Sequence, residues 1–311
     1  MGLGYPFQAM YKFAPGPIGV MIFFSLSGYL VARSWVSDPH LIRFFYRRAL
    51  RIFPAVVACT LFTITVVGIF FSNLLFIDYL QHEVTRNFLL NCILYIQFYL
   101  PGVFENNPYP LAVNGSLWTL PIEFCCYMIL GLTLFATQNR SSIAILMIIF
   151  WSASLNQYYF ELFWNRWVSD SFVLYASDLR YVLKYGAYFL CGACIGLFKL
   201  ERFLSWFTIG IAATLLIGFS QFAFAPFLLP ILIVGLGIRP ITKSFQWTLK
   251  SDYSYGLYIY AFPVQQGLAA INPLMAWEVY FALTVLITTS LAAASWHFIE
   301  KPALAFKPHV S

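Results

Sequence analysis

Long apolar stretches separated by short polar or basic segments recur along the whole chain. A helix that crosses a bilayer needs about 20 mostly apolar residues, and the stretches approach that length or can borrow flanking residues to reach it. The pattern predicts ten apolar elements within one membrane domain spanning residues 1–311. They are Ile18–Val31, Pro54–Phe71, Phe88–Leu100, Leu117–Phe135, Ile143–Leu155, Leu183–Phe198, Trp206–Phe219, Phe222–Gly237, Tyr255–Ile271 and Trp277–Trp296. The predicted fold class is therefore an all-α, polytopic helical membrane bundle.

Composition supports this assignment and removes one class of function. Hydrophobic residues make up 61% of the 311 residues, charged residues only 10%, and the mean hydropathy is +0.76. Soluble domains carry roughly 25% charged residues, so this composition cannot cover a surface that faces water. The net charge of +6 is spread over short clusters between apolar runs, as in cytoplasmic membrane loops. Nucleic-acid binding is therefore excluded.

The basic residues also predict an orientation. Phe88–Leu100 is short and contains Asn91 and Gln97. If it is re-entrant or interfacial, the other nine elements alternate across the membrane. Most of the 18 Lys and Arg residues, including the basic segment Arg33–Arg51, then lie in the cytoplasm with the C-terminus, as the positive-inside rule requires. The N-terminus then starts outside without a signal segment, which leads us to expect one more spanning helix upstream.

The segment RFFYRRALRIFP contains a candidate anion site. Arg43, Arg47 and Arg51 are spaced by four residues, so on a helix they form one stripe with Arg48 beside it. Guanidinium groups bind phosphate with two parallel hydrogen bonds, which predicts binding of a coenzyme A phosphate. The alternative is membrane-orienting charge that binds anionic lipid head groups, and the two interpretations are compatible.

Two further motifs contain polar residues within apolar runs. In FFSLSGYLV, small residues such as Ser27 and Gly28 permit close helix packing, and a serine nucleophile is not expected without an adjacent His. In NGSLWTLPIEFCCY, Ser116 and Trp118 precede Glu123, which lies just inside an apolar span. Ionisable groups at membrane depth mark function, so Glu123 is a candidate proton carrier; the alternative is an interfacial carboxylate near the head groups.

The remaining polar features favour structural roles. Cys191 and Cys194 have a redox or metal spacing, but they lie in an apolar run without a second Cys or His pair. They are interpreted as small packing residues, and no metal site is expected. Asn156–Arg180 is rich in aromatic residues, which indicates either an interfacial aromatic belt or a platform for a sugar acceptor. Glu300 and Lys301 are expected to form a charge pair at a helix end.

Five segments occur in an order that resembles a known family: FFSLSGYLV, RFFYRRALRIFP, NGSLWTLPIEFCCY, DYSYGLYIYAFPVQQ and WHFIEKPA. Between about Pro17 and Pro302 the chain resembles integral-membrane acyltransferases of the acyltransferase-3 group, such as O-antigen and exopolysaccharide O-acetylases. The resemblance implies transfer of an acyl group, usually acetyl from acetyl-CoA, to a hydroxyl of an envelope carbohydrate. It also implies that Arg47, Arg48 and Arg51 serve the donor, and that the Ser-Gly motif and Glu123 are important for structure or catalysis.

One difference from the family leaves alternatives open. In the family, a spanning helix upstream of the FFxxSG element carries the His taken as the catalytic base, so we expect this chain to be truncated at its N-terminus. Its own histidines do not match that position: His40, His82, His297 and His309. A non-catalytic family member is therefore one alternative. A transporter or flippase of lipid-linked saccharides is another, but it leaves the Arg stripe unexplained.

The sequence thus predicts an acyltransferase of the bacterial inner membrane. Its expected donor is acetyl-CoA or another acyl-CoA, bound by Arg43, Arg47, Arg48 and Arg51. The expected acceptor is an envelope glycan or a lipid-linked saccharide, with membrane lipids around the apolar surface. Glu123 is the expected catalytic residue, and Ser27, Gly28, Ser116 and Trp118 are expected to bind substrate or shape the site.

Overall fold

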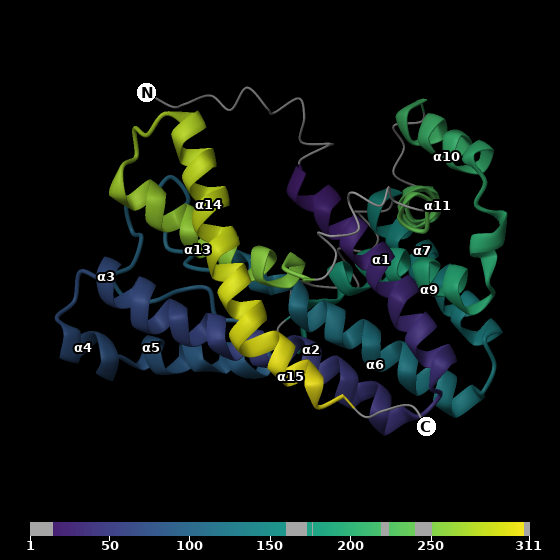
Figure 1. Cartoon of the computed structure of the whole chain (residues 1–311), viewed down its shortest axis with the longest axis horizontal. Coiled ribbons are helices and arrows are strands. Elements are labelled where there is room, and N and C mark those ends of the chain that lie inside the picture. Colours follow the sequence, from purple (N-terminus) through teal and green to yellow (C-terminus); the bar gives the residue numbers. More distant parts are fainter. Residues whose placement is uncertain (1–14, 160–172, 176, 219–223, 240–250, 308–311) are drawn as a thin grey trace. The chain divides into compact units, whose positions relative to one another are not determined.

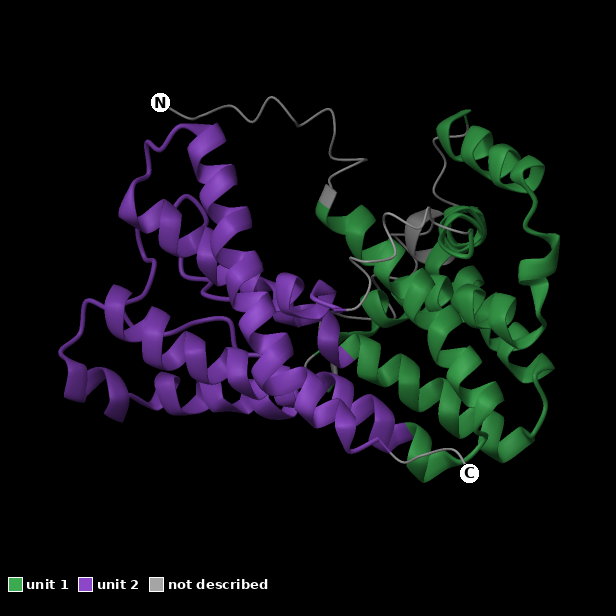
Figure 2. Ribbon diagram, viewed as in Figure 1, with its two compact units in different colours: residues 1–44, 122–240 green, residues 45–121, 241–311 purple. Residues whose placement is uncertain are grey.

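The structure is a computed structural model that describes residues 15–159, 173–175, 177–218, 224–239 and 251–307. Helices dominate this described part (Figure 1), which confirms the all-α prediction. Its strands are β1 (Val173–Leu174) and β2 (Ser177–Asp178), an antiparallel pair with Val173 opposite Asp178. The chain divides into two compact units (Figure 2): Met1–Phe44 with Ile122–Pro240, and Phe45–Pro121 with Ile241–Ser311.

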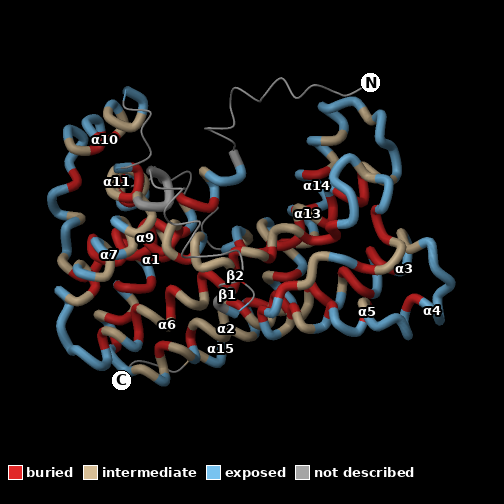
Figure 3. Tube along the Cα trace, turned by 180° about the vertical axis from the view of Figure 1, so that it is seen from behind, coloured by how far each residue is buried: buried red, intermediate tan, exposed pale blue. Residues whose placement is uncertain are grey.

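Unit 1 is built around the pairing of its first helix with a helix from the middle of the chain. Its helices are α1 (Pro15–Ser37), α6 (Thr119–Thr137) from Ile122 onward, α7 (Ser141–Tyr159), α9 (Leu179–Leu197), the 3₁₀ turn η5 (Leu200–Phe203), α10 (Trp206–Gly218) and α11 (Ala225–Gly237). Helix α1 packs along α9, and both contact α11. Most of α9 is buried, as the red stretches of the trace indicate (Figure 3).

Glycines allow α1 and α9 to touch backbone to backbone. A Cβ added at Gly28 would lie 1.9 Å from the carbonyl oxygen of Phe189, and one added at Gly192 would lie 2.1 Å from the carbonyl oxygen of Ser25. No side chain fits at either distance, so the close approach requires glycine on both helices. The hydroxyl of Ser25 donates to the carbonyl of Met21 at 2.7 Å within α1. The predicted packing role of the FFSLSGYLV motif is therefore seen directly.

Unit 2 contains the helical elements of residues 45–121 and 241–311, which flank the second segment of unit 1 in the sequence. They are α2 (Leu41–Phe62) from Phe45 onward, the π-helical turn η2 (Thr63–Gly68), α3 (Ile69–Phe71), α4 (Phe76–Gln81), α5 (Glu83–Phe88), the 3₁₀ turns η3 (Leu89–Ile93) and η4 (Gly115–Trp118), α13 (Ser254–Ile271), α14 (Trp277–Ser295), the π-helical turn η7 (Trp296–Glu300) and α15 (Lys301–Ala305). Helices α13 and α14 pack against each other along their lengths.

The basic segment Arg33–Arg51 is helical except for one short turn. Only Asp38–His40 is non-helical, and the next helix begins at Leu41 and continues through Pro54. Proline removes one backbone donor from a helix, but neighbouring groups in membrane helices restore the lost hydrogen bonding. The apolar element expected from Pro54 therefore begins earlier, and the arginines lie on the first turns of a long helix.

Phe88–Leu100 forms no spanning helix, as predicted. The chain leaves its short helix at Leu94, which has φ +63°, and continues as extended backbone that pairs Tyr99 with Ala112. Leu100 and its neighbours in the loop enter a buried apolar cluster of unit 2. The members are Ile64, Val67, Tyr79, Phe88, Leu100, Val103, Phe104 and Val113. This segment therefore covers the π-helical turn η2 with a non-helical layer.

The described helices confirm an integral membrane protein. Within the described residues, four helices are long and apolar enough to cross a bilayer: Gly16–Ser37, Leu41–Phe71, Gly115–Thr137 and Trp277–Ala305. Three shorter apolar helices accompany them, and the expected number of nine spans stays a prediction. Most of the aromatic segment Asn156–Arg180 lies outside the described residues, so neither interpretation of it is tested.

Candidate active site

A carboxylate and two hydroxyls form a buried cluster in unit 1. The hydroxyl of Ser27 on α1 donates to Oε1 of Glu123 at 3.4 Å and lies 3.1 Å from the hydroxyl of Tyr127. The Tyr127 hydroxyl also donates to Glu123 Oε1. Glu123 and Ser27 are only 4% and 8% exposed. The structure thus brings together two residues from separate predicted motifs.

Local sequence explains this geometry. Glu123 and Tyr127 are four residues apart on α6, so they lie on one face of the helix. Ser27 reaches them from α1, next to the glycine that lets α1 approach α9. A carboxylate that accepts two hydroxyl hydrogen bonds is suited to hold or pass a proton or to orient a hydroxyl. Sequence reasoning missed Tyr127, although its spacing from Glu123 was a usable signal.

The four predicted donor arginines divide into different environments. Arg43 binds the carboxylate of Asp38 with both Nε and Nη2, at 2.9 and 2.6 Å. Asp38 is 3% exposed and lies in the turn between α1 and α2. This paired arrangement gives Arg43 a structural task in unit 1, fixing that turn.

Arg51 lies between two carboxylates of unit 2. Its Nη2 is 2.6 Å from Oδ2 of Asp252, its Nη1 is 3.8 Å from Oε2 of Glu300, and its guanidinium lies over the ring of Tyr255 at 5.7 Å. Glu300 is 2% exposed and accepts a hydrogen bond from Ser295 at 3.0 Å. The expected helix-end pair of Glu300 with Lys301 is therefore wrong. The π-helical turn Trp296–Glu300 shifts the side-chain register relative to an α-helix, and Glu300 pairs with Arg51.

A fourth cation joins Arg47, Arg48 and Arg51. Burial lowers the pKa of Lys307, and the positive charges of Arg48, Arg51 and Arg47 lower it further. Arg47 is 7% exposed, so part of this positive charge is removed from water. We call these four residues the cation site. Lys307 lies near the C-terminal end of the chain, far from α2 in the sequence, so no local sequence pattern connects the two.

Asp252, close to the start of α13, places a negative charge beside Arg51 of the cation site. Burial alone would raise its pKa, but hydrogen bonds from Ser254 and the charge of Arg51 outweigh burial and leave the pKa below its usual value. The Ser254 backbone N–H donates to Asp252 Oδ1 at 3.3 Å. Tyr253, one residue later, lies 3.1 Å from Nε2 of His297 through its hydroxyl.

Ser116 and Trp118 lie in the 3₁₀ turn that leads into α6. The buried Asn114 fixes this turn: its Oδ1 accepts from the Ser116 backbone N–H at 3.1 Å, and its Nδ2 donates to the carbonyl of Ile259 at 2.9 Å. The contact with Ile259 ties the turn to α13. Ser116 and Trp118 therefore lie in a segment whose position is set by Asn114, which sequence reasoning did not single out.

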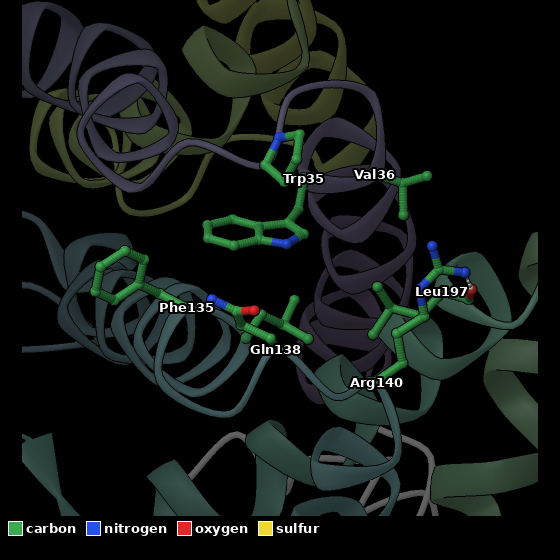
Figure 4. A pocket seen from close by; sticks show the side chains of 8 residues that line it. Trp35, Val36, Phe135, Gln138, Arg140 and Leu197 are labelled. Carbon is green, nitrogen blue, oxygen red and sulfur yellow. Dashed lines mark hydrogen bonds between the residues drawn. The ribbon is translucent and has the colours of Figure 1, made fainter.

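A cavity of about 430 Å³ lies in unit 1 beside the turn between α1 and α2. Figure 4 shows the indole of Trp35, the amide of Gln138 and the guanidinium of Arg140 around it. One Nη of Arg140 donates to the carbonyl of Leu197 at 3.0 Å, the dashed line in the figure. The cavity thus combines a flat ring with hydrogen-bond donors.

Cysteines and possible metal ligands add no further site in the described part of the chain. Cys191 and Cys194 are free thiols buried in α9. Among the described residues, no group of three or more His, Cys, Asp and Glu side chains could hold a metal ion.

Together these features define a class of protein. It is a helical membrane protein with a buried carboxylate between hydroxyls and a cluster of cations at the start of a spanning helix. Such a protein has the parts needed to handle a proton and an anionic substrate at the bilayer.

Residues 2–297 match the acyltransferase domain family. The chain therefore belongs to the acyltransferase-3 family, as its motifs predict, and it is an acyltransferase. It is 31% identical over 310 residues to an O-acetyl transferase of Shigella phage Sf6, covering 96% of this chain and 88% of that protein. It is 24% identical over 319 residues to nodulation protein 10 of Rhizobium leguminosarum bv. viciae, covering 93% and 82%. No solved structure matches the chain significantly. Family membership favours the enzyme over the transporter interpretation.

Proposed function

We propose that this protein transfers an acetyl group from acetyl-CoA, or a related acyl group from another acyl-CoA, to a hydroxyl of a cell-envelope carbohydrate. The similarity to an O-acetyl transferase over most of both chains supports the acetyl group and the hydroxyl acceptor. The acceptor is an envelope glycan or a lipid-linked saccharide, and nucleic acid has no part in the reaction.

The cation site is the observation that carries the donor assignment. Three arginines and a lysine lie close enough for their charges to lower the pKa of Lys307. Phosphate oxygens bind a group of cations such as this through charge-assisted hydrogen bonds. We assign the phosphate contacts of acyl-CoA to Arg47, Arg48, Arg51 and Lys307, with Arg51 oriented by Asp252 and Glu300. Arg43 supports the donor side indirectly, through the turn that it fixes.

The reaction requires an oxygen nucleophile and transfer of one proton. The acceptor hydroxyl oxygen forms an ester bond with the thioester carbonyl carbon, and the carbon–sulfur bond breaks. The proton leaves the hydroxyl and finally protonates the departing thiolate, so the products are the ester and free coenzyme A. Glu123 assists this proton movement or orients its partner, with Ser27 and Tyr127 holding the carboxylate in place.

The orientation follows from the same assignment. Acyl-CoA is a cytoplasmic metabolite, so the cation site faces the cytoplasm, in agreement with the positive-inside rule. Lys307 belongs to this site, so the C-terminal end of the chain is also cytoplasmic. The membrane is the bacterial inner membrane, with its lipids around the apolar helices. Reporter fusions that place residues 38–40 in the periplasm would refute this orientation.

Substitution of one arginine tests the donor site. Arg48→Ala should raise the Kd for coenzyme A roughly 10- to 100-fold, because a hydrogen bond to a charged group contributes about 1.5–3 kcal/mol. Arg86→Ala is the matched control, since Arg86 is an exposed arginine of α5. Both variants are measured by calorimetry in detergent, beside transfer of labelled acetyl from acetyl-CoA to envelope glycan. Wild-type affinity in Arg48→Ala would contradict the donor site, and absence of transfer by the wild-type enzyme would contradict the function.

A further inference from the structure

A second cavity lies in unit 2, where α13 ends and α14 begins. Its volume is about 450 Å³, within the range of roughly 300–1,000 Å³ that is typical of small-molecule sites. Its walls come from the loop that precedes α6, from the last turns of α13 and from the first turn of α14. The residues that matter for its chemistry are Tyr109, Phe262, Gln265, Asn272, Trp277 and Tyr280.

The wall formed by the loop is fixed by a buried amide. Gln266 is 5% exposed, and its Nε2 donates to the carbonyls of Tyr109 and Ala112 at 2.7 and 2.6 Å. Asn107 donates through Nδ2 to the Gln266 side-chain oxygen at 3.1 Å and to its backbone carbonyl at 2.9 Å. A fully paired network of this kind holds a wall in one position. The cavity is therefore preformed rather than a chance gap between neighbouring segments.

The lining suits a neutral ligand with apolar faces and polar edges. Tyr109 and Trp277 are 64% and 67% exposed, and the Tyr109 ring is held edge-on against Phe262, with centroids 5.8 Å apart. Gln265 adds an amide group, and among the described residues no Lys, Arg, Asp or Glu lines the cavity. Aromatic faces carry partial negative charge and attract the polarised C–H face of a sugar ring, while amides bind its hydroxyls.

The cavity and the cation site lie at opposite ends of one helix. Asp252, which binds Arg51, lies two residues before the start of α13, and cavity residues occupy the later turns of that helix. Eighteen residues span about 27 Å at about 1.5 Å per residue, close to the roughly 30 Å hydrocarbon thickness of a bilayer. The cavity therefore lies about one helix length from the residues assigned to the donor phosphates.

We infer that this cavity binds a sugar residue of the acceptor glycan. This inference rests on the proposed function, because it assigns the acceptor of the same reaction. An aromatic belt at the membrane interface would also contain Trp and Tyr, but a belt requires neither a cavity nor a wall fixed by a buried amide. Trp277 and Tyr109 stack on the ring, and Gln265 binds its hydroxyls.

Kinetics of the full-length enzyme in detergent test the inference. The enzyme transfers labelled acetyl from acetyl-CoA to saccharides that mild acid releases from bacterial envelope glycan. Trp277→Ala should raise the KM for saccharide about ten-fold, as expected for loss of a central aromatic contact, and leave the KM for acetyl-CoA unchanged. Trp277→Phe should retain most of the affinity, and Gln265→Ala, at an exposed position, should raise the same KM with little effect on folding. Trp206→Ala is the control, since Trp206 is 65% exposed at the start of α10 in unit 1.

The outcomes separate this inference from the proposed function. Wild-type saccharide KM values in Trp277→Ala, Tyr109→Ala and Gln265→Ala, with transfer intact, would overturn the inference and leave the function standing. If the wild-type protein transfers no acetyl, titration of tryptophan fluorescence with the same saccharides tests directly whether the cavity binds sugar. A saturable change that is lost in Gln265→Ala and retained in Trp206→Ala would then support the sugar site although the function fails.

Discussion

Replacing Gly28 by alanine should separate α1 from α9. The added Cβ would lie 1.9 Å from the carbonyl oxygen of Phe189, where ordinary contact begins at 3.4 Å. The difference of about 1.5 Å must be made up by backbone movement, because the opposing atom belongs to a helix backbone. Overpacking typically costs roughly 1–3 kcal/mol and occasionally more, and a backbone clash belongs at the upper end. Gly28→Ala should therefore lower the Tm markedly.

The same displacement should reach the candidate active site. Ser27 is the neighbour of Gly28, and its hydrogen bond to Glu123 is already 3.4 Å long. A shift of α1 by about 1 Å would break this contact, because hydrogen bonds weaken steeply beyond normal distances. Acyl transfer should therefore fall even in the fraction that stays folded.

Thermal unfolding in detergent and acetyl transfer at a temperature below the Tm measure the two effects separately. Gly19→Ala is the matched control on the same helix, because a Cβ there meets nothing within 4 Å; it should behave as wild type. Equal Tm and equal activity in Gly28→Ala and Gly19→Ala would refute this close packing of α1 and α9.

Two further predictions concern single carboxylates. Glu123→Gln keeps the shape of the side chain and removes its charge; activity should fall about 100-fold, the usual contribution of proton transfer, at an unchanged Tm, and full activity would exclude Glu123 from the chemistry. For Asp252, hydrogen bonds from Ser254 and the charge of Arg51 outweigh burial and lower the pKa. Its contribution to stability should be complete above about pH 4 and disappear as the pH falls through the lowered pKa. The difference in Tm between wild type and Asp252→Asn should therefore vanish on acidification, and a difference that persists at low pH would contradict this account.

Short-range sequence patterns were sufficient to predict much of the fold and the family. Apolar length and low charge determine a helical membrane protein, because the bilayer demands internally satisfied backbone hydrogen bonds. The motif around Ser27 and Gly28 predicted close helix packing. The polar residues Asn91 and Gln97 correctly indicated that Phe88–Leu100 is not a spanning helix. The element predicted from Pro54 begins too late, because the helix starts at Leu41 and continues through the proline.

The long-range partners of the site residues could only come from the tertiary structure. Ser27 meets Glu123 across 96 positions of sequence, and Arg51 meets Asp252 across 201. No local periodicity records such pairings, because they depend on which helices pack and in which register. The sequence by itself therefore determined the class of protein and the residue types that carry its chemistry. Packing decided that Arg51 is held by carboxylates, that Lys307 joins the cation site, and that Glu300 faces inward.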